Sequence, residues 1–116
     1  MSQKNQGLLI IDDEKGIREQ LAWCFQGDYE VFLASHRTEA IAALRRHAPA
    51  VVTLDLGLPP DTQGVSEGLK TLEEILSLSP ATKVILITGN QDHAVAVQAI
   101  GMGAYDLYEK DRKSVV

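Results

Sequence analysis

The chain has 116 residues, of which 45% are hydrophobic and 23% are charged, values typical of one globular domain. Eleven lysines and arginines against sixteen acidic residues give a net charge of −5, which argues against sequence-independent nucleic-acid binding because that requires a basic face. The single cysteine, Cys24, can form neither an internal disulfide nor a multi-thiolate metal site, and no apolar run approaches the roughly 20 residues that span a bilayer. These features favour a single-domain cytoplasmic protein.

Five short apolar segments, rich in β-branched residues, predict β-strands. The first, third and fourth are almost continuously apolar, which is typical of strands covered on both faces of a parallel sheet. The second and fifth are more mixed and are expected at the edges of the sheet. The segments are residues 8–11, 29–33, 51–54, 83–88 and 104–108.

The stretches between these strands have apolar residues at helical spacing and predict four helices. Pro49 and Pro80 end the second and third helices, and Gly101 with Gly103 closes the fourth. Trp23 is expected to pack in or beside the first helix. Because strands and helices alternate, we expect an α/β domain with right-handed crossovers. The expected apolar stripes are Ile17, Leu21, Cys24 and Phe25; Ala40, Ile41 and Leu44; Leu69, Leu72, Ile75 and Leu76; and Ala94, Val95, Val97 and Ile100.

Polar residues follow the strands at the edge where parallel sheets bind ligands. Asp12 and Asp13 follow the first strand and Asp55 follows the third, so three carboxylates converge if these strands are neighbours. Carboxylates about 5 Å apart repel by about 3 kcal/mol at an effective dielectric near 20. Such a cluster suits the oxygen ligands of a hard divalent cation, with Mg²⁺ as the favoured ion. Thr88 ends the fourth strand and Lys110 follows the fifth, and both are expected at the rim.

Each of these residues also has a simpler interpretation. Asp13 and Glu14 could cap the following helix, and Asp55 could be a turn residue. Thr88 could end a strand and Lys110 could be a solvated charge. The occurrence of all these residues at strand ends, in order, favours one shared site.

The order and spacing of these motifs resemble the receiver domains of two-component response regulators. The matching stretches lie within about residues 7–111 and are residues 10–14, 52–59, 87–89 and 103–106, together with Lys110. The loop after Pro59 and residues 103–106 are most similar to the receivers of NtrC-like transcriptional activators. The resemblance implies a flavodoxin-like, doubly wound sheet of five parallel strands in the order 2-1-3-4-5.

The resemblance also implies a chemistry. Asp55 would accept a phosphoryl group from a sensor histidine kinase or a phosphotransfer protein, and the domain would assist this transfer and its own dephosphorylation without being an enzyme otherwise. Lys110 would pair with a phosphoryl oxygen, and the Thr88 hydroxyl would move to hydrogen-bond another, which is the implied conformational switch. The domain itself would contact neither nucleic acid nor membrane. The implied Mg²⁺ ligands are Asp12, Asp13, Asp55 and the backbone carbonyl of Gly57.

Two departures from the family pattern lie near this site. Residues 60–67 form a long polar loop before Gly68, where the family has a shorter one. Leu107 stands three residues before Lys110, at the position where the family has an aromatic switch residue. Tyr105 and Tyr108 are expected on the opposite face of the strand.

A third departure is the end of the chain. Only a few residues follow the last strand, so the family's fifth helix is expected to be missing. We therefore expect residues 1–116 to be a single receiver domain truncated from a longer regulator, which would carry downstream ATPase and DNA-binding domains. The sheet face near the first and fifth strands would then lie bare and favour a homodimer.

Two other functions are compatible with parts of the sequence. A receiver-like interaction module with weak or no phosphorylation is favoured by Leu107 and by Asp111, which follows Lys110 where the family has a proline. The complete set of polar site residues opposes this alternative. A Mg²⁺-dependent phosphohydrolase would need a general acid two residues after the nucleophile, and Gly57 occupies that position after Asp55.

Overall fold

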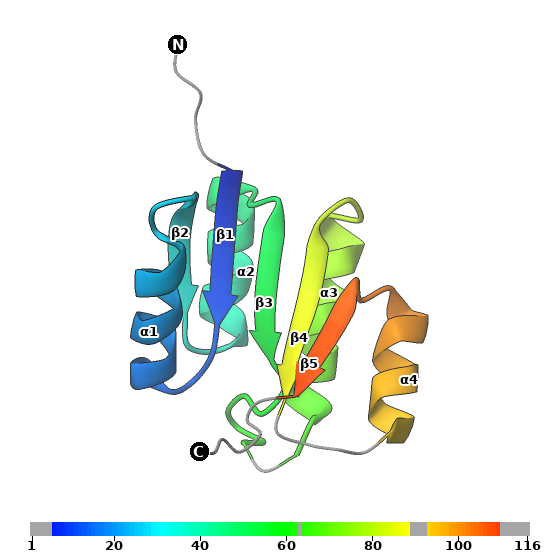
Figure 1. Cartoon of the computed structure of the whole chain (residues 1–116). Coiled ribbons are helices and arrows are strands. Elements are labelled where there is room, and N and C mark those ends of the chain that lie inside the picture. The colour runs from blue at the N-terminus through cyan, green and yellow to red at the C-terminus, as the bar shows by residue number, and fades with distance from the viewer. Residues whose placement is uncertain (1–5, 63, 89–92, 110–116) are drawn as a thin grey trace.

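The computed structural model describes residues 6–62, 64–88 and 93–109, and within them the chain forms one five-stranded sheet with four helices (Figure 1). The strands are β1 (Gln6–Ile11), β2 (Tyr29–Ala34), β3 (Val51–Asp55), β4 (Lys83–Thr88) and β5 (Asp106–Glu109); the helices are α1 (Lys15–Phe25), α2 (Arg37–His47), α3 (Ser66–Leu78) and α4 (His93–Met102). All neighbouring strands are parallel and follow the order β2-β1-β3-β4-β5. The predicted fold class and strand order are confirmed. The expectation of a missing fifth helix concerns residues 110–116, which lie outside the described residues.

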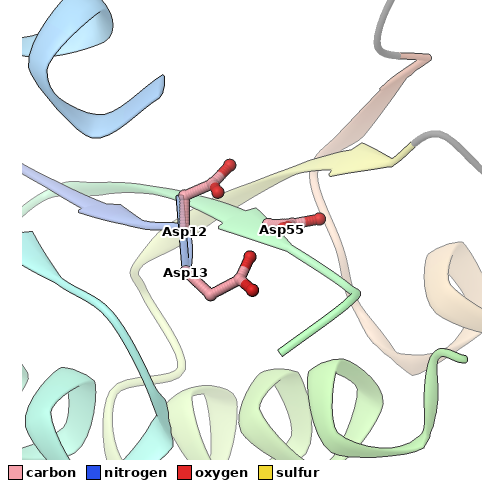
Figure 2. Close-up of side chains that lie close together, drawn as sticks. All are labelled: Asp12, Asp13 and Asp55. Atoms are coloured by element: carbon pink, nitrogen blue, oxygen red, sulfur yellow. The ribbon is translucent and has the colours of Figure 1, made fainter. Parts of the chain in front are cut away.

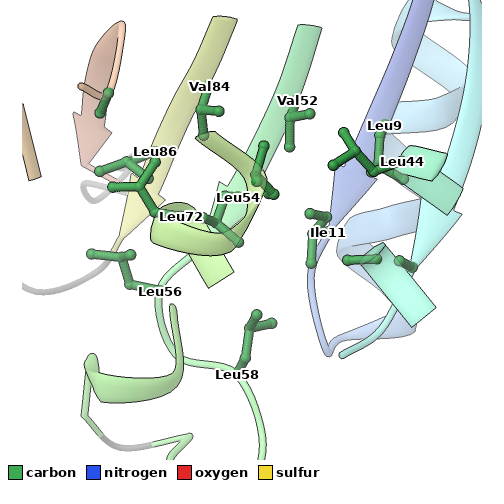
Figure 3. Packing of buried hydrophobic residues seen from close by; sticks show 14 of the residues in the cluster. Leu9, Ile11, Leu44, Val52, Leu54, Leu56, Leu58, Leu72, Val84 and Leu86 are labelled. Atoms are coloured by element: carbon green, nitrogen blue, oxygen red, sulfur yellow. The ribbon is translucent and has the colours of Figure 1, made fainter. Parts of the chain in front are cut away.

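The main hydrophobic core lies between one face of the sheet and helices α2, α3 and α4 (Figure 3). Alternate side chains of the three central strands point into it and are almost completely shielded from solvent. The predicted stripes of α2 and α3 are confirmed, because their apolar residues meet these strand side chains. The central members of this core are Leu9, Ile11, Leu44, Val52, Leu54, Leu72, Ile75, Val84 and Leu86.

The predicted stripe of α4 is confirmed at Val95 and wrong at Ala94, Val97 and Ile100. Ala99 is completely buried, and Val95 and Met102 pack against the core from the same side of the helix. Val97 is 72% exposed and Ile100 is 47% exposed. This helix is apolar almost all the way round, so its periodicity does not define one inward face, and the contact with α3 decides which side is buried.

Helix α1 packs more loosely than the predicted stripe implied. None of its residues is buried: Leu21 and Phe25 are half-buried, while Cys24 is exposed and Trp23 is 75% exposed. The inward packing expected for Trp23 and Cys24 is therefore wrong. Among the described elements α1 contacts mainly β1 and β2, at one side of the sheet (Figure 1), and the residues on its other side are exposed to solvent.

The sheet face opposite the main core is only partly open. Leu8 and Ile10 alternate with the core residues of β1 and are 3% and 0% exposed, so the bare surface expected beside the first strand is not present. At β5, Tyr108 is 58% exposed. Leu107 packs against the main core while its neighbour Tyr108 is exposed, as alternation along β5 predicts. Tyr105 is also exposed but lies before β5, so the strand face predicted for it is not tested.

The strand order places the polar strand ends at one edge. Strands β1 and β3 are direct neighbours, with Ile11 opposite Leu54, so the residues that follow β1 lie beside the end of β3. No helix in the described part of the chain is long and apolar enough to cross a membrane.

Candidate functional site

Three carboxylates meet at the carboxyl edge of the sheet. Asp12, Asp13 and Asp55 each offer an oxygen, and these three oxygens lie within 4.8 Å of one another (Figure 2). Asp12 is 2% exposed and Asp55 is 6% exposed, while Asp13 is half-buried. Charges at this separation repel by about 3 kcal/mol per pair at an effective dielectric near 20. The predicted convergence is confirmed, and the cluster could bind a metal ion.

The turn after β1 is held by backbone and side-chain hydrogen bonds. The Asp12 N–H donates to the carbonyl of Ala34 at 3.0 Å, which ties the turn to the end of β2. The Asp12 Oδ1 atom accepts from the Glu14 N–H at 2.9 Å, and the Asp12 carbonyl accepts from Arg18 Nη1 at 2.8 Å. Glu14 is the N-cap residue of α1, but its side chain makes no capping hydrogen bond. Helix capping by Glu14 therefore does not explain the acidic cluster.

The turn after β3 is equally constrained. The Gly57 N–H donates to Asp55 Oδ1 at 3.2 Å, so Asp55 is a turn residue as well as a member of the cluster. Gly68, in the first turns of α3, packs directly on Leu56, and a Cβ there would overlap the Leu56 backbone. Helix α3 therefore fixes the backbone between Asp55 and Gly57.

An ion-pair network next to the site connects α2 to α3. Arg37 Nε donates to Glu67 Oε2 at 2.6 Å, and Arg37 Nη1 donates to Glu74 Oε1 at 3.2 Å. Glu67 is 7% exposed, and the two carboxylates raise the pKa of Arg37, with the Glu67 hydrogen bond as the largest cause. A cleft of about 450 Å³ lies beside this network, lined by His36, Arg37, Thr38, Pro59, Pro60 and Glu67.

The remaining predicted site residues are placed only in part. Thr88 is the last residue of β4, paired with Glu109 of β5, so its backbone lies at the expected edge. Lys110 lies outside the described residues. Leu107 is half-buried on β5, packed against the main core.

Sequence reasoning missed three residues that shape this edge. Arg18 lies one turn into α1 and bonds back to Asp12; an arginine six residues after the first aspartate is a signal that could have suggested this contact. Arg37 of α2 bonds to Glu67 of α3, and Asp61 bonds to Ser66 from the irregular loop after β3. Neither pair has the spacing of a helix or a strand, so the sequence alone could not indicate these partners.

The fold and the acidic edge define the class of protein. The sequence matches the family model of the response regulator receiver domain over residues 8–115, and the chain therefore belongs to this family. Among its relatives, the chain is 33% identical over 104 residues to the C4-dicarboxylate transport transcriptional regulatory protein DctD of Rhizobium meliloti. The match covers 89% of this chain and 22% of DctD. The chain is thus a response regulator receiver domain that is similar in sequence to the receivers of DctD and of NtrX-like response regulators.

Solved structures agree with this assignment. The crystal structure of NtrX from Brucella abortus in complex with ADP has a TM-score of 0.82 and 34% identity, covering 94% of this chain and 24% of NtrX. A response regulator from Burkholderia pseudomallei with a phosphorylated aspartic acid, a calcium ion and citrate has a TM-score of 0.83 and 27% identity, covering 94% of this chain and 62% of that one. The chain spans about a fifth of the length of the curated relatives it matches.

Proposed function

We propose that this domain accepts a phosphoryl group on Asp55 from a phosphohistidine of a sensor kinase or a phosphotransfer protein. The observation that carries the proposal is the meeting of Asp12, Asp13 and Asp55 at one edge of a receiver fold. The Burkholderia pseudomallei regulator, which shares the fold, carries a phosphorylated aspartic acid and a calcium ion. Asp55 is the member of the cluster that ends a central strand, so we assign it as the acceptor.

The donor set fits a hard divalent cation, because all three clustered ligands are carboxylates. We propose that Asp12, Asp13, Asp55 and the backbone carbonyl of Gly57 hold Mg²⁺. Bound Mg²⁺ would neutralise negative charge on the carboxylates and on the transferred phosphoryl oxygens.

The protein groups around Asp55 support its role as the acceptor. In the proposed transfer, a carboxylate oxygen of Asp55 forms a bond to phosphorus while the bond from phosphorus to the histidine nitrogen breaks, and the imidazole leaves with that electron pair. The Gly57 N–H bond to Asp55 Oδ1 holds the carboxylate in one orientation before the reaction. Thr88 and Lys110 would bind phosphoryl oxygens, and Leu107 would occupy the switch position without an aromatic ring.

We further propose that residues 1–116 act as one receiver domain of a longer regulator whose output is transcription. DctD is named a transcriptional regulatory protein and is about five times as long as the matched part. Downstream ATPase and DNA-binding domains, as implied by the resemblance to NtrC-like activators, would then carry out the output.

The proposal predicts that the wild-type domain gains one phosphoryl group from a small phosphodonor in the presence of Mg²⁺, and that Asp55→Asn gains none. Intact mass spectrometry measures this directly. Mg²⁺ alone should raise the melting temperature by mass action, and Asp13→Asn should raise the melting temperature without Mg²⁺ but reduce the Mg²⁺ response. Asp28→Asn, in the exposed turn after α1, is the matched control. Labelling of the Asp55→Asn variant, or a melting curve indifferent to millimolar Mg²⁺, would contradict the proposal.

A further inference from the structure

The long loop after β3 folds back onto the backbone beside Asp55. The Leu58 N–H donates to the Leu56 carbonyl at 3.0 Å, and the Asp61 N–H donates to the Leu58 carbonyl at 2.9 Å. The carbonyl oxygen of Thr62 lies 2.7 Å from the point that a Cβ on Gly57 would occupy. The loop is therefore seated directly on the Gly57 peptide, at the same edge of the sheet as the acidic cluster (Figure 1).

The side chain of Asp61 holds the far end of this loop. Its Oδ2 atom accepts from Ser66 Oγ at 2.6 Å and from the Ser66 N–H at 3.3 Å. The backbone of Asp61 also accepts a hydrogen bond from the Gly64 N–H at 3.2 Å. A side chain at Gly64 would collide with the Asp61 carboxylate, so glycine at this position leaves room for the contact.

The contact between Asp61 and Ser66 replaces an ordinary helix cap. Ser66 is the first residue of α3, and the N-cap residue Val65 makes no side-chain capping hydrogen bond. A carboxylate near a helix N-terminus is favourable because it satisfies an N–H group and meets the positive end of the helix dipole. The hydrogen bonds from Ser66 accordingly lower the pKa of Asp61.

Helix α3, which carries Ser66, is itself held in place by packing and by an ion pair. Gly68 packs against Leu56, and Glu67 is ion-paired to Arg37 of α2. The loop thus contacts Gly57 through the Thr62 carbonyl and the start of α3 through the Asp61 carboxylate.

We propose that Asp61 is a positioning residue for the phosphoacceptor site: through Ser66 it holds residues 58–62 against Gly57 and thereby fixes the backbone next to Asp55. This inference rests on the proposed function, in which the Gly57 carbonyl is a Mg²⁺ ligand. Loss of the contact removes one of the restraints on the Gly57 peptide, while the Gly57 N–H bond to Asp55 and the packing of Gly68 on Leu56 remain, and Mg²⁺ binding weakens because one ligand is less well preorganised.

A different role for Asp61 would be purely electrostatic, since any carboxylate near the cluster attracts a cation. Two variants separate the two roles. Ser66→Ala removes the 2.6 Å hydrogen bond and keeps every charge, whereas Asp61→Asn removes the charge and keeps a side-chain acceptor for Ser66. A positioning role predicts that Ser66→Ala weakens Mg²⁺ binding clearly, whereas a purely electrostatic role predicts that Ser66→Ala leaves the Mg²⁺ affinity unchanged.

The experiment is a Mg²⁺ titration followed by the amide resonances of Asp55 and Gly57, for the wild type, Asp61→Ala, Ser66→Ala, Asp61→Asn and the double variant of Asp61→Ala with Ser66→Ala. We expect Asp61→Ala and Ser66→Ala each to weaken Mg²⁺ binding by about three- to tenfold, at or below the low end of the range for outer-shell partners. The double variant should bind Mg²⁺ no more weakly than Asp61→Ala, because Asp61→Ala already removes both hydrogen bonds, whereas Ser66→Ala leaves the one from the Ser66 N–H. The Mg²⁺ affinity of Asp61→Asn should fall between that of these variants and that of the wild type, and the affinity of Asp28→Asn should equal that of the wild type.

Hydrogen exchange at Gly57 and Leu58 without Mg²⁺ tests the positioning independently of metal binding. Exchange should be faster in Asp61→Ala and Ser66→Ala and unchanged in Asp28→Asn. Unchanged exchange together with wild-type Mg²⁺ affinity in Ser66→Ala would overturn the positioning role. If the wild type itself does not respond to Mg²⁺ while exchange follows the expected order, the proposed metal site is wrong and the structural contact stands.

Discussion

Helices α1 and α3 are 11 and 13 residues long and both carry an apolar stripe, yet they contribute very differently to this domain. Helix α3 buries five residues, among them Leu72 and Ile75 at 0% exposure, and its first turns pack on Leu56, directly after Asp55. Helix α1 buries none, and its Trp23 is 75% exposed. Similar stripes thus lead to different burial, because among the described elements α3 contacts helices on both sides, α2 and α4, whereas α1 contacts mainly the strands β1 and β2.

This difference has a functional counterpart. The α3 side fixes the backbone around Asp55 through Gly68, Glu67 and the loop contact of Asp61. The α1 side touches the site through Arg18 and the turn after β1. We therefore expect substitutions in α3 to change stability strongly, and equivalent substitutions in α1 to change it little or in the opposite direction.

The largest contrast is expected for two helical glycines. Gly68→Ala should destabilise the fold by about 2–3 kcal/mol or more, since a Cβ would overlap the Leu56 backbone. Gly16→Ala, in the first turn of α1, has no atom within 4 Å of the new Cβ and should stabilise by about 0.5 kcal/mol through helix propensity. Urea unfolding of both variants measures the difference. Equal effects of the same sign would contradict the contrast between the two helices.

A smaller contrast is expected for two ion pairs. Arg37→Met removes the partner of the nearly buried Glu67 and should cost about 1–2 kcal/mol, reduced from the value for a fully buried pair because the Arg37 side chain is 39% exposed. Lys15→Met removes a 3.8 Å pair with Glu19 whose side chains are 78% and 62% exposed, and should cost less than about 0.5 kcal/mol. Thermal unfolding at low and high salt compares the two. If Lys15→Met lost as much unfolding free energy as Arg37→Met, the two ion pairs would not differ in their contribution to stability.

The smallest effect concerns pH and the start of α2. Glu39 accepts hydrogen bonds from the Ser35 N–H at 2.6 Å and from Ser35 Oγ at 2.9 Å, which lower its pKa from the ordinary 4.5. A lowered pKa in the folded state stabilises the fold above the unfolded value, and this contribution is lost as the pH falls through the folded value. Glu39→Gln should therefore be less stable than the wild type near pH 7, by less than about 1 kcal/mol because the side chain is exposed, and the difference should disappear in acid.

Urea midpoints between pH 3 and pH 7 measure this dependence. Ser35→Ala is the companion variant, because it removes the Oγ hydrogen bond and should reduce the pH dependence without removing the carboxylate. A constant difference between wild type and Glu39→Gln over this range would show that the ionised form of Glu39 contributes nothing.

Much of the fold could be predicted from local patterns. The five strands were expected within about two residues of their observed bounds, because buried parallel strands are nearly continuous apolar runs. The meeting of Asp12, Asp13 and Asp55 followed from the rule that parallel strands present their carboxyl ends at one edge, once β1 and β3 are neighbours. The family resemblance supplied the strand order itself.

By itself, then, the sequence determined the alternation of strands and helices, the acidic edge and the stripes of α2 and α3. Only the tertiary structure decided that α4 buries Ala99 and exposes Val97, because a helix that is apolar on all sides takes its orientation from its neighbours. It also decided that Asp61 bonds to Ser66 and that Arg37 bonds to Glu67. These polar contacts join residues five and thirty positions apart, and no period of a helix or a strand relates such positions, so only the folded chain brings the partners together.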